Sequence, residues 1–190
     1  QPANTSRTIT TWSPITTQTA SAIMSSIHSG APSDPCLHHL FILGTNPISM
    51  ELTTILNTSI FTATFPDGWK HVGVRPLLKK PFADPSDLKN YRPISLLPYP
   101  TKVLEKASKQ QLTEYLELNH LLNALQSGFR TNRSMETALI AATDNIRTLL
   151  DHGETMALIL LDLSVFDTVS HHTLLNKRHN IGIQQNALKW

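Results

Sequence analysis

The stretch Met156-Ala157-Leu158-Ile159-Leu160-Leu161 is almost continuously apolar, and Asp162 follows it directly. A short apolar run bounded by turn residues is typical of a central β-strand that is buried on both faces. A carboxylate at the end of such a strand loses hydration unless it caps a helix, meets a cation or holds a metal ion. The pattern therefore predicts a core strand over residues 156–161 and makes Asp162 the first candidate for a functional side chain.

Spacing alone leaves the role of Asp162 open. A structural helix cap is the commoner role for an Asp at such a position, and a metal ligand is the rarer one. Asp167 lies five residues further on and could share an ion with Asp162 or cap the next helix, of which the cap is the simpler role.

Upstream of this strand, four segments have helical patterns. Helices are expected to begin at Ser13-Pro14 and at Asn46-Pro47, and a third is expected to have Thr101 as its N-cap. A fourth is expected over 134–150 and is ended by Asp151-His152-Gly153. The expected apolar faces are Ile15, Ala22, Ile23 and Ile27; Ile48, Leu52, Ile55, Leu56 and Ile60; Val103, Leu104, Ala107, Leu112, Tyr115 and Leu116; and Leu139, Thr143, Ile146 and Leu150.

Between the second and third helices the sequence predicts a β-hairpin. Val72, Val74 and Leu77 fit a strand, and the turn cluster 84–87 separates it from a partner strand over 91–97. Pro93 has no backbone N–H, so it must lie at an edge or outside the ladder of hydrogen bonds. The predicted fold class is therefore α+β, helix-rich with a small sheet.

The positive charge is concentrated in the middle of the chain. Residues 69–133 hold eleven lysines and arginines against five acidic residues, whereas the chain as a whole has a net charge of +2. Lysine and arginine bind nucleic-acid backbones by displacing counterions, so the middle segment is a candidate phosphate-binding surface. An ordinary solvated surface is an equally good interpretation of charge alone.

The composition and the missing motifs exclude several other classes of protein. One cysteine excludes an internal disulfide framework, and no apolar run approaches the ~20 residues that cross a bilayer. A Gly-rich phosphate loop and a Gly-x-Ser-x-Gly nucleophile turn are both missing from the sequence. We expect an intracellular protein without a membrane partner, whose first twenty residues are a solvated lead-in.

Six short motifs resemble, in the same order, those of reverse transcriptases from LINE-type (non-long-terminal-repeat) retrotransposons. Six matches in one order are much more specific than any single one, and the likeness covers roughly positions 12 to 190, weakening before Phe65. The motifs are Phe65-Pro66-Asp67-Gly68-Trp69-Lys70, Pro76-Leu77-Leu78-Lys79-Lys80-Pro81, Asn90-Tyr91-Arg92-Pro93-Ile94-Ser95-Leu96-Leu97, Gln126-Ser127-Gly128-Phe129-Arg130, Glu136-Thr137-Ala138-Leu139 and Leu160-Leu161-Asp162-Leu163-Ser164.

The resemblance implies a partial right-hand polymerase, with a helical lead-in over 1–64 and the fingers and first part of the palm over 65–190. Its implied partners are an RNA template, a DNA primer and a deoxynucleotide triphosphate. Lys79, Lys80 and Arg92 would lie near the triphosphate or the template, and Gln126, Gly128 and Arg130 would handle the template. Gly128 would permit close backbone approach, and Arg130 would supply charge.

For the catalytic centre, the resemblance implies that Asp162 is the first Mg²⁺ carboxylate of the palm. Two-metal nucleotidyl transfer needs further carboxylates, which the family takes from a later Asp-Asp pair that these 190 residues do not contain. Phe166 would lie beneath the nucleotide sugar, but one residue fewer separates it from Asp162 than in the family pattern. We therefore expect an inactive polymerase fragment that binds no Mg²⁺ productively and self-associates through an exposed palm edge.

Two alternatives to that expectation stay open. One is a nucleic-acid-binding remnant in which the basic segment still holds RNA or DNA without catalysis. The other is a translated remnant that folds only in part.

Overall fold

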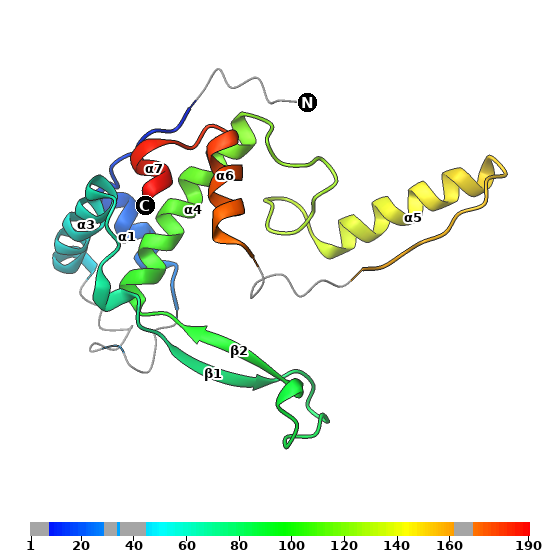
Figure 1. Ribbon diagram of the computed structural model, residues 1–190, viewed down its shortest axis with the longest axis horizontal. Helices are drawn as coiled ribbons and strands as arrows, with labels where there is room; N and C mark the ends of the chain where they lie inside the picture. Colours follow the sequence, from blue (N-terminus) through cyan, green and yellow to red (C-terminus); the bar gives the residue numbers. More distant parts are fainter. Residues whose placement is uncertain (1–7, 29–33, 35–44, 162–168) are drawn as a thin grey trace.

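The computed structural model describes residues 8–28, 34, 45–161 and 169–190 (Figure 1). Among these residues, no helix is long and apolar enough to cross a membrane. The elements in chain order are α1 (Thr17–Ser25), α3 (Thr45–Thr62), the 3₁₀ turn η1 (Asp67–Trp69), β1 (Gly73–Leu78), the 3₁₀ turn η2 (Leu88–Asn90), β2 (Tyr91–Leu96), α4 (Tyr99–Leu118), α5 (Met135–Asp151), α6 (His171–Asn180) and α7 (Gln185–Lys189). This is the mixed, helix-rich composition with a small sheet that the sequence predicts.

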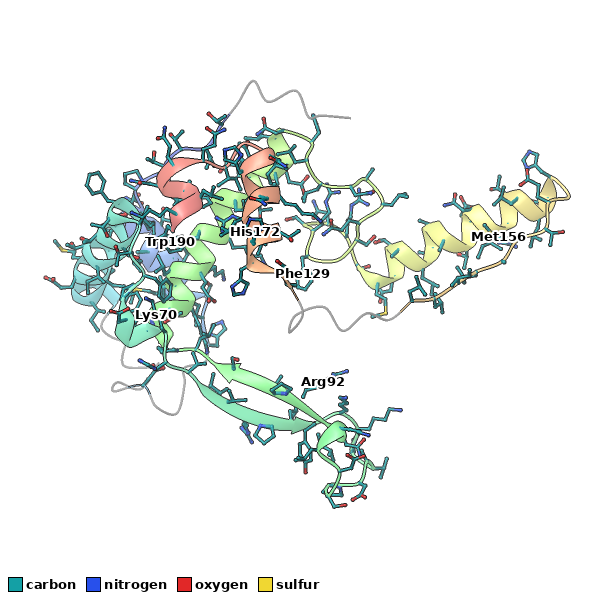
Figure 2. All side chains as sticks on the ribbon, viewed as in Figure 1. Lys70, Arg92, Phe129, Met156, His172 and Trp190 are labelled. Atoms are coloured by element: carbon teal, nitrogen blue, oxygen red, sulfur yellow. The ribbon has the colours of Figure 1, made fainter. Side chains whose placement is uncertain are left out.

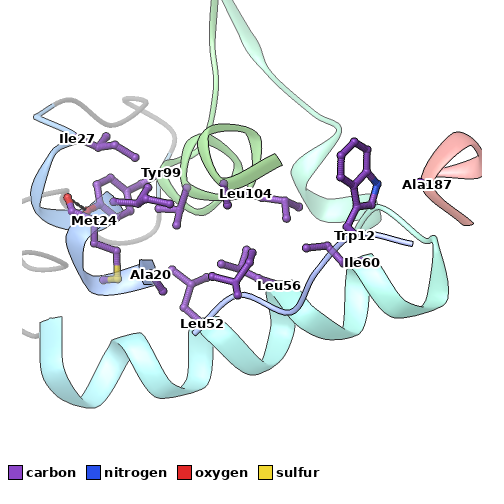
Figure 3. Packing of buried hydrophobic residues seen from close by; sticks show 14 of the residues in the cluster. Trp12, Ala20, Met24, Ile27, Leu52, Leu56, Ile60, Tyr99, Leu104 and Ala187 are labelled. Carbon is purple, nitrogen blue, oxygen red and sulfur yellow. Dashed lines mark hydrogen bonds between the residues drawn. The ribbon is translucent and has the colours of Figure 1, made fainter. Parts of the chain in front are cut away.

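The core is formed by α1, α3, α4 and α7, which pack around one apolar cluster (Figure 3). Tyr99 is fully buried and donates its hydroxyl to the Met24 carbonyl oxygen at 2.7 Å, which joins α4 to α1. The cluster contains residues from both the expected lead-in, 1–64, and the expected polymerase part, 65–190. Its buried members are Trp12, Ile15, Ala20, Ile23, Met24, Ile27, Leu52, Leu56, Ile60, Tyr99, Val103, Leu104, Ala107, Tyr115, Ile183 and Ala187.

The predicted start of the first helix is wrong by about one turn. The N-cap of α1 is Thr16, whose side chain accepts the Thr19 N–H at 3.1 Å. The Asn57 side-chain amide of α3 bonds both the N–H and the carbonyl oxygen of Ile15, at 2.7 and 2.9 Å. The Gln111 amide of α4 does the same for Ser13. These side chains, which are distant in sequence, form hydrogen bonds with backbone N–H and carbonyl groups that a helix would otherwise pair.

The start of α4 also differs from the prediction. The helix begins at Tyr99, with Pro98 as N-cap, and Thr101 lies buried inside the first turn. The Asp34 carboxylate accepts the Tyr99 N–H at 3.2 Å, so the capping acceptor comes from a residue far away in sequence. In the predicted stripes of α1 and α3, Ala22 and Ile55 are exposed, whereas the other apolar residues of those stripes are buried or partly buried.

The first twenty residues are not a solvated lead-in where the structure describes them. Ile9 forms a parallel β-bridge with Ile183, and its N–H donates to the Gly182 carbonyl oxygen at 2.9 Å. Trp12 is 6% exposed and packs edge-to-face on Trp190, with ring centroids 6.3 Å apart. Phe65 contacts the same Trp190 ring. Burying these aromatic rings stabilises the contact between the two ends of the described chain.

The hairpin of β1 and β2 projects from the helical body, and α5 extends from it in a different direction (Figure 1). The two strands pair antiparallel with Pro76 opposite Pro93. Lys79 N–H donates to the Asn90 carbonyl oxygen at 2.7 Å, and hydrogen-bonded pairs recur at every second position from there. Both prolines therefore occupy a non-hydrogen-bonded pair, where no N–H is required.

Helix α5 lies within one residue of the predicted bounds 134–150 but does not have the predicted burial. Ser134 and Thr137 form a capping box, and Gly153 (φ +76°) follows the C-cap His152. None of its residues is buried. Of the predicted stripe, Leu139, Thr143 and Leu150 are exposed and Ile146 is half-buried. The stripe has helical periodicity, but no other described element covers it.

The predicted core strand over 156–161 is wrong for this chain. Those residues form neither a strand nor a bridge, and Leu158 to Leu161 are 65–85% exposed (Figure 2 labels Met156). A strand needs a neighbour that accepts and donates its backbone hydrogen bonds. The only sheet among the described residues is the hairpin, and it pairs with itself. An apolar run without a pairing partner therefore stays on the surface.

Candidate nucleic-acid interface

One face of the hairpin carries its positive charge. Side chains directly opposite each other in an antiparallel pair lie on the same face, and alternate residues of each strand share that face. Arg75 lies opposite Ile94, and Leu77 lies opposite Arg92. The two arginines are therefore diagonal neighbours on one exposed face, which the pairs at Pro76 and Leu78 do not share. We call Arg75, Leu77, Arg92 and Ile94 the arginine face.

The lysines that follow β1 continue this charge toward the tip of the hairpin. Lys79 lies four residues after Arg75 and so continues the same face of the hairpin. Its Nζ donates to the Lys89 carbonyl oxygen at 2.7 Å. Lys80 is exposed. Among the described residues, no carboxylate lies within 4.0 Å of Arg75, Lys80 or Arg92. Their charges are therefore not neutralised by a neighbouring acid.

The tip between the strands is ordered by its own side chains. The Asp84 carboxylate accepts the N–H and the hydroxyl of Ser86 at 2.9 and 2.8 Å, and these hydrogen bonds lower the pKa of Asp84. Asp87 caps η2 by accepting the Lys89 N–H, and the Tyr91 hydroxyl donates to the Pro85 carbonyl oxygen. A tip with this many local bonds holds the two strands in register.

Arg92 and the second predicted group, Gln126 to Arg130, lie on different elements (Figure 2 labels Arg92 and Phe129). Gln126 donates its side-chain amide to the Gly128 carbonyl oxygen at 3.2 Å. A Cβ built on Gly128 would meet no atom within 4 Å, so the space above that backbone is open. The backbone of Gly128 is therefore open to the close approach that the resemblance implies, and no atom of the described residues fills that space.

Arg130 already has a partner inside the protein. Its Nε and one terminal nitrogen grip the two oxygens of Glu117 on α4 at 3.1 and 2.7 Å, and its other terminal nitrogen donates to the Asn123 carbonyl oxygen. The Arg130 side chain is 13% exposed. A two-pronged arginine–carboxylate pair fixes orientation as well as distance. The first effect of this side chain is thus to tie the segment before α5 to α4.

Asp162 and Phe166, with Asp167, lie outside the described residues. Their roles as metal ligand and nucleotide contact stay predictions. Among the described residues, no three His, Cys, Asp or Glu side chains come close enough to hold a metal ion. The sequence reasoning missed Arg75. Once Pro76 is known to pair with Pro93, Arg75 and Arg92 must lie on the same face of the hairpin.

Comparisons with known proteins find the same family that the motifs resemble. The family model described as "Reverse transcriptase (RNA-dependent DNA polymerase)" matches residues 77–190, more than half of the chain. This range includes Arg92 on the hairpin and the Gln126–Arg130 segment.

Three relatives from Drosophila melanogaster match over similar lengths. The chain is 30% identical over 123 residues to a probable RNA-directed DNA polymerase from transposon X-element. It is 28% identical over 129 residues to one from transposon BS, and 28% identical over 127 residues to the RNA-directed DNA polymerase from mobile element jockey. The matches cover 64–67% of this chain and 13–14% of the relatives, so the chain spans a small part of their length.

The family model and the three relatives agree in family. The chain belongs to the reverse transcriptase (RNA-dependent DNA polymerase) family, and it corresponds to part of the reverse transcriptase domain of LINE-type retrotransposon polymerases.

Proposed function

We propose that this chain is the fingers and first part of the palm of a right-hand RNA-directed DNA polymerase, and that it contacts nucleic acid without polymerising by itself. The observation that carries the proposal is the arginine face, of which Leu77, Arg92 and Ile94 lie inside the region matched by the family model and Arg75 lies two residues before it. It offers two guanidinium groups on an exposed ribbon, with no acid among the described residues to neutralise them.

The chemistry of the arginine face suits phosphate. A guanidinium presents planar N–H donors in a fork that matches two phosphate oxygens, and it keeps its charge at any physiological pH. Leu77 and Ile94 lie between the arginines on the same face and are 52% and 40% exposed. Apolar side chains beside cationic ones can contact a sugar or a base while the arginines hold the backbone. The proposed occupants are the template strand and the triphosphate of the incoming nucleotide.

The proposed lack of catalysis rests on the carboxylates. Metal-assisted nucleotidyl transfer would need carboxylates from more than one element to hold the two ions that supply its chemistry. Asp162 is proposed as one such ligand. The 190 residues contain no adjacent Asp pair, and the described residues contain no cluster that would replace it. On this proposal the donor set does not fit a pair of metal ions.

We therefore expect no extension of a DNA primer on an RNA template when the purified chain is supplied with deoxynucleotides and Mg²⁺. The reason is that one carboxylate cannot position both ions. Gel analysis of a labelled primer is the measurement. The control is Asp162→Asn: template-dependent synthesis that this change abolishes would show an active centre and overturn the proposed inactivity.

The arginine face makes a separate prediction about binding. Arg75→Gln with Arg92→Gln should weaken binding to an RNA–DNA hybrid and reduce the slope of log affinity against log salt by about 0.9 for each phosphate that is no longer neutralised. The matched control is Lys177→Gln with Lys189→Gln, which removes two exposed charges from α6 and α7. Fluorescence anisotropy at several salt concentrations measures both. Equal slopes for the two double variants would remove the arginine face from the interface.

A further inference from the structure

An apolar pocket of about 490 Å³ lies between α4 and α6. Leu112 and Leu116 line it from α4, Leu174 lines it from α6, and the rings of Trp12 and Trp190 border it as well. We call it the α4–α6 pocket. Its volume falls in the range of about 300–1,000 Å³ that is typical of small-molecule sites. No residue of the arginine face lines it, so it is separate from the proposed nucleic-acid contacts.

Arg178 brings a half-buried positive charge to the wall of this pocket. One of its terminal nitrogens donates to the Ala187 carbonyl oxygen at 3.1 Å, whereas its Nε–H is buried and has no acceptor among the described residues. Burial lowers the pKa of Arg178, and no carboxylate of the described residues lies within 4.0 Å to compensate for the lost hydration. A charge in such surroundings is unfavourable unless an opposite charge pairs with it. The Arg178 side chain therefore favours an anionic occupant.

Trp12 adds a second donor without a partner. Its indole is buried, and the Nε1–H has no acceptor among the described residues. In Figure 3 the indole nitrogen lies on the side of the ring that faces Ala187. Ala187 donates its N–H to the Thr10 carbonyl oxygen at 2.9 Å and accepts the bond from Arg178. One residue of α7 thus contacts both Arg178 and the segment that carries Trp12. An acceptor placed in the pocket would restore the hydrogen bonds that both donors lose on burial.

The other charged residues of the lining limit the kind of anion. Lys109 is a second cation, and Glu105 is the one acid among the described residues that line the pocket. Burial raises the pKa of Glu105, and the charge of Lys102 opposes that shift. The two cations exceed the acid by one charge, which a singly charged head group would balance. A doubly charged phosphate would be repelled by Glu105.

Trp12 also borders a neighbouring pocket of about 660 Å³. The described residues that line this second pocket are neutral, among them Asn57 and Asn186. Only the α4–α6 pocket, of these two, combines the Trp12 donor with a cation. The combination of donors, charge and apolar walls is what points to one class of ligand.

We propose that the α4–α6 pocket binds a free apolar monocarboxylate of the fatty-acid type. Its carboxylate accepts from the N–H groups of Arg178 and Trp12, and its hydrocarbon body lies against the leucines of α4 and α6. The planar guanidinium matches a carboxylate in both geometry and charge. Burial of the hydrocarbon supplies affinity that is independent of the charge. The bound molecule connects α6 to α4. The inference goes beyond the proposed function and does not depend on it.

The first test compares octanoate with octanamide in calorimetric titrations of the full 190-residue chain. The two molecules have the same hydrocarbon body, but octanamide lacks the negative charge. Octanamide should bind roughly tenfold more weakly, because it cannot pair with the guanidinium charge. Octyl phosphate, the third probe, should bind no more tightly than octanoate.

The second test places the binding at the pocket. Arg178→Gln should weaken octanoate binding roughly tenfold and leave octanamide binding nearly unchanged. Trp12→Phe keeps an aromatic ring without the Nε1 donor, and it should weaken octanoate binding roughly threefold. Lys177→Gln is the matched control, since it removes the neighbouring exposed charge of α6, which does not line the pocket. Leu160→Ala is the control for binding to the exposed apolar segment 156–161.

Each outcome supports the inference or overturns it. Equal affinities for octanoate and octanamide overturn the anion site, and tighter binding of octyl phosphate overturns the choice of a carboxylate. Binding that does not saturate, or that Leu160→Ala weakens as much as Arg178→Gln does, overturns the pocket. Circular dichroism shows whether each variant keeps the fold. If Arg178→Gln unfolds, the comparison of octanoate with octanamide on the unaltered chain decides. None of these results changes the affinity for the RNA–DNA hybrid, which tests the proposed function by itself.

Discussion

Replacing Leu104 by alanine should lower the free energy of unfolding by about 2–5 kcal/mol. Leu104 is fully buried in the cluster that α4 shares with α1 and α3 (Figure 3). Removing its isobutyl group loses the transfer free energy of the buried carbons and leaves a cavity that neighbouring side chains fill only in part. Urea unfolding followed by circular dichroism measures the change.

The matched control is Leu160→Ala. Leu160 lies in the run that the sequence predicts as the core strand, yet its side chain is 85% exposed. Its replacement should change stability by less than about 0.5 kcal/mol. A decrease as large as that of Leu104→Ala would show that residues 156–161 are buried, and it would contradict the structure. Absence of a cooperative transition in the unaltered chain would favour the partly folded remnant.

The second large effect concerns self-association. We expect the chain to form oligomers in a concentration-dependent manner, because the segment 156–161 and α5 expose many apolar side chains. Ile159 and Leu161 are 77% and 79% exposed, and Leu139 and Ile140 on α5 are 64% and 66% exposed. Apolar surface of this extent favours association with other copies of the chain. Residues 156–161 belong to no sheet among the described residues, so their backbone groups could pair with a strand from another molecule.

Leu158→Glu with Leu160→Glu should shift the chain toward the monomer, because like charges would repel across the contact. Sedimentation velocity over a range of concentrations is the measurement. Phe82→Glu with Leu88→Glu is the control. These side chains are also exposed, but they belong to the connection between β1 and β2 rather than to the 156–161 segment. A monodisperse monomer for the unaltered chain, or equal dissociation by both double variants, would contradict the expectation.

The candidate interface was predictable where it depended on neighbouring residues in sequence. The basic middle of the chain and the two-stranded hairpin both follow from composition and turn chemistry, and the structure confirms the hairpin. The sequence did not show that Arg130 would be held by Glu117, thirteen residues away. It also did not show that Phe129 would line a groove beside α4. Both depend on how the segment 119–134 folds back on the helix.

Local chemistry determined those features whose partners lie within a few residues. The bounds of α5 follow from a capping box between Ser134 and Thr137 and from Gly153, whose N–H donates to the Leu150 carbonyl oxygen. The hairpin register follows from two strands and a turn that closes on itself. The match of the family model to residues 77–190 is likewise a property of the linear sequence.

Tertiary structure decided which apolar residues are buried and which backbone groups are paired. The backbone of Ile9 bonds to Gly182 and Gln184, and the Asn57 amide bonds both backbone groups of Ile15. The run 156–161 has the composition of a core strand, but burial requires a partner that a single segment cannot supply. Periodicity and composition state what a segment can do. Long-range contacts then select one of those possibilities, because only they remove a given face from water.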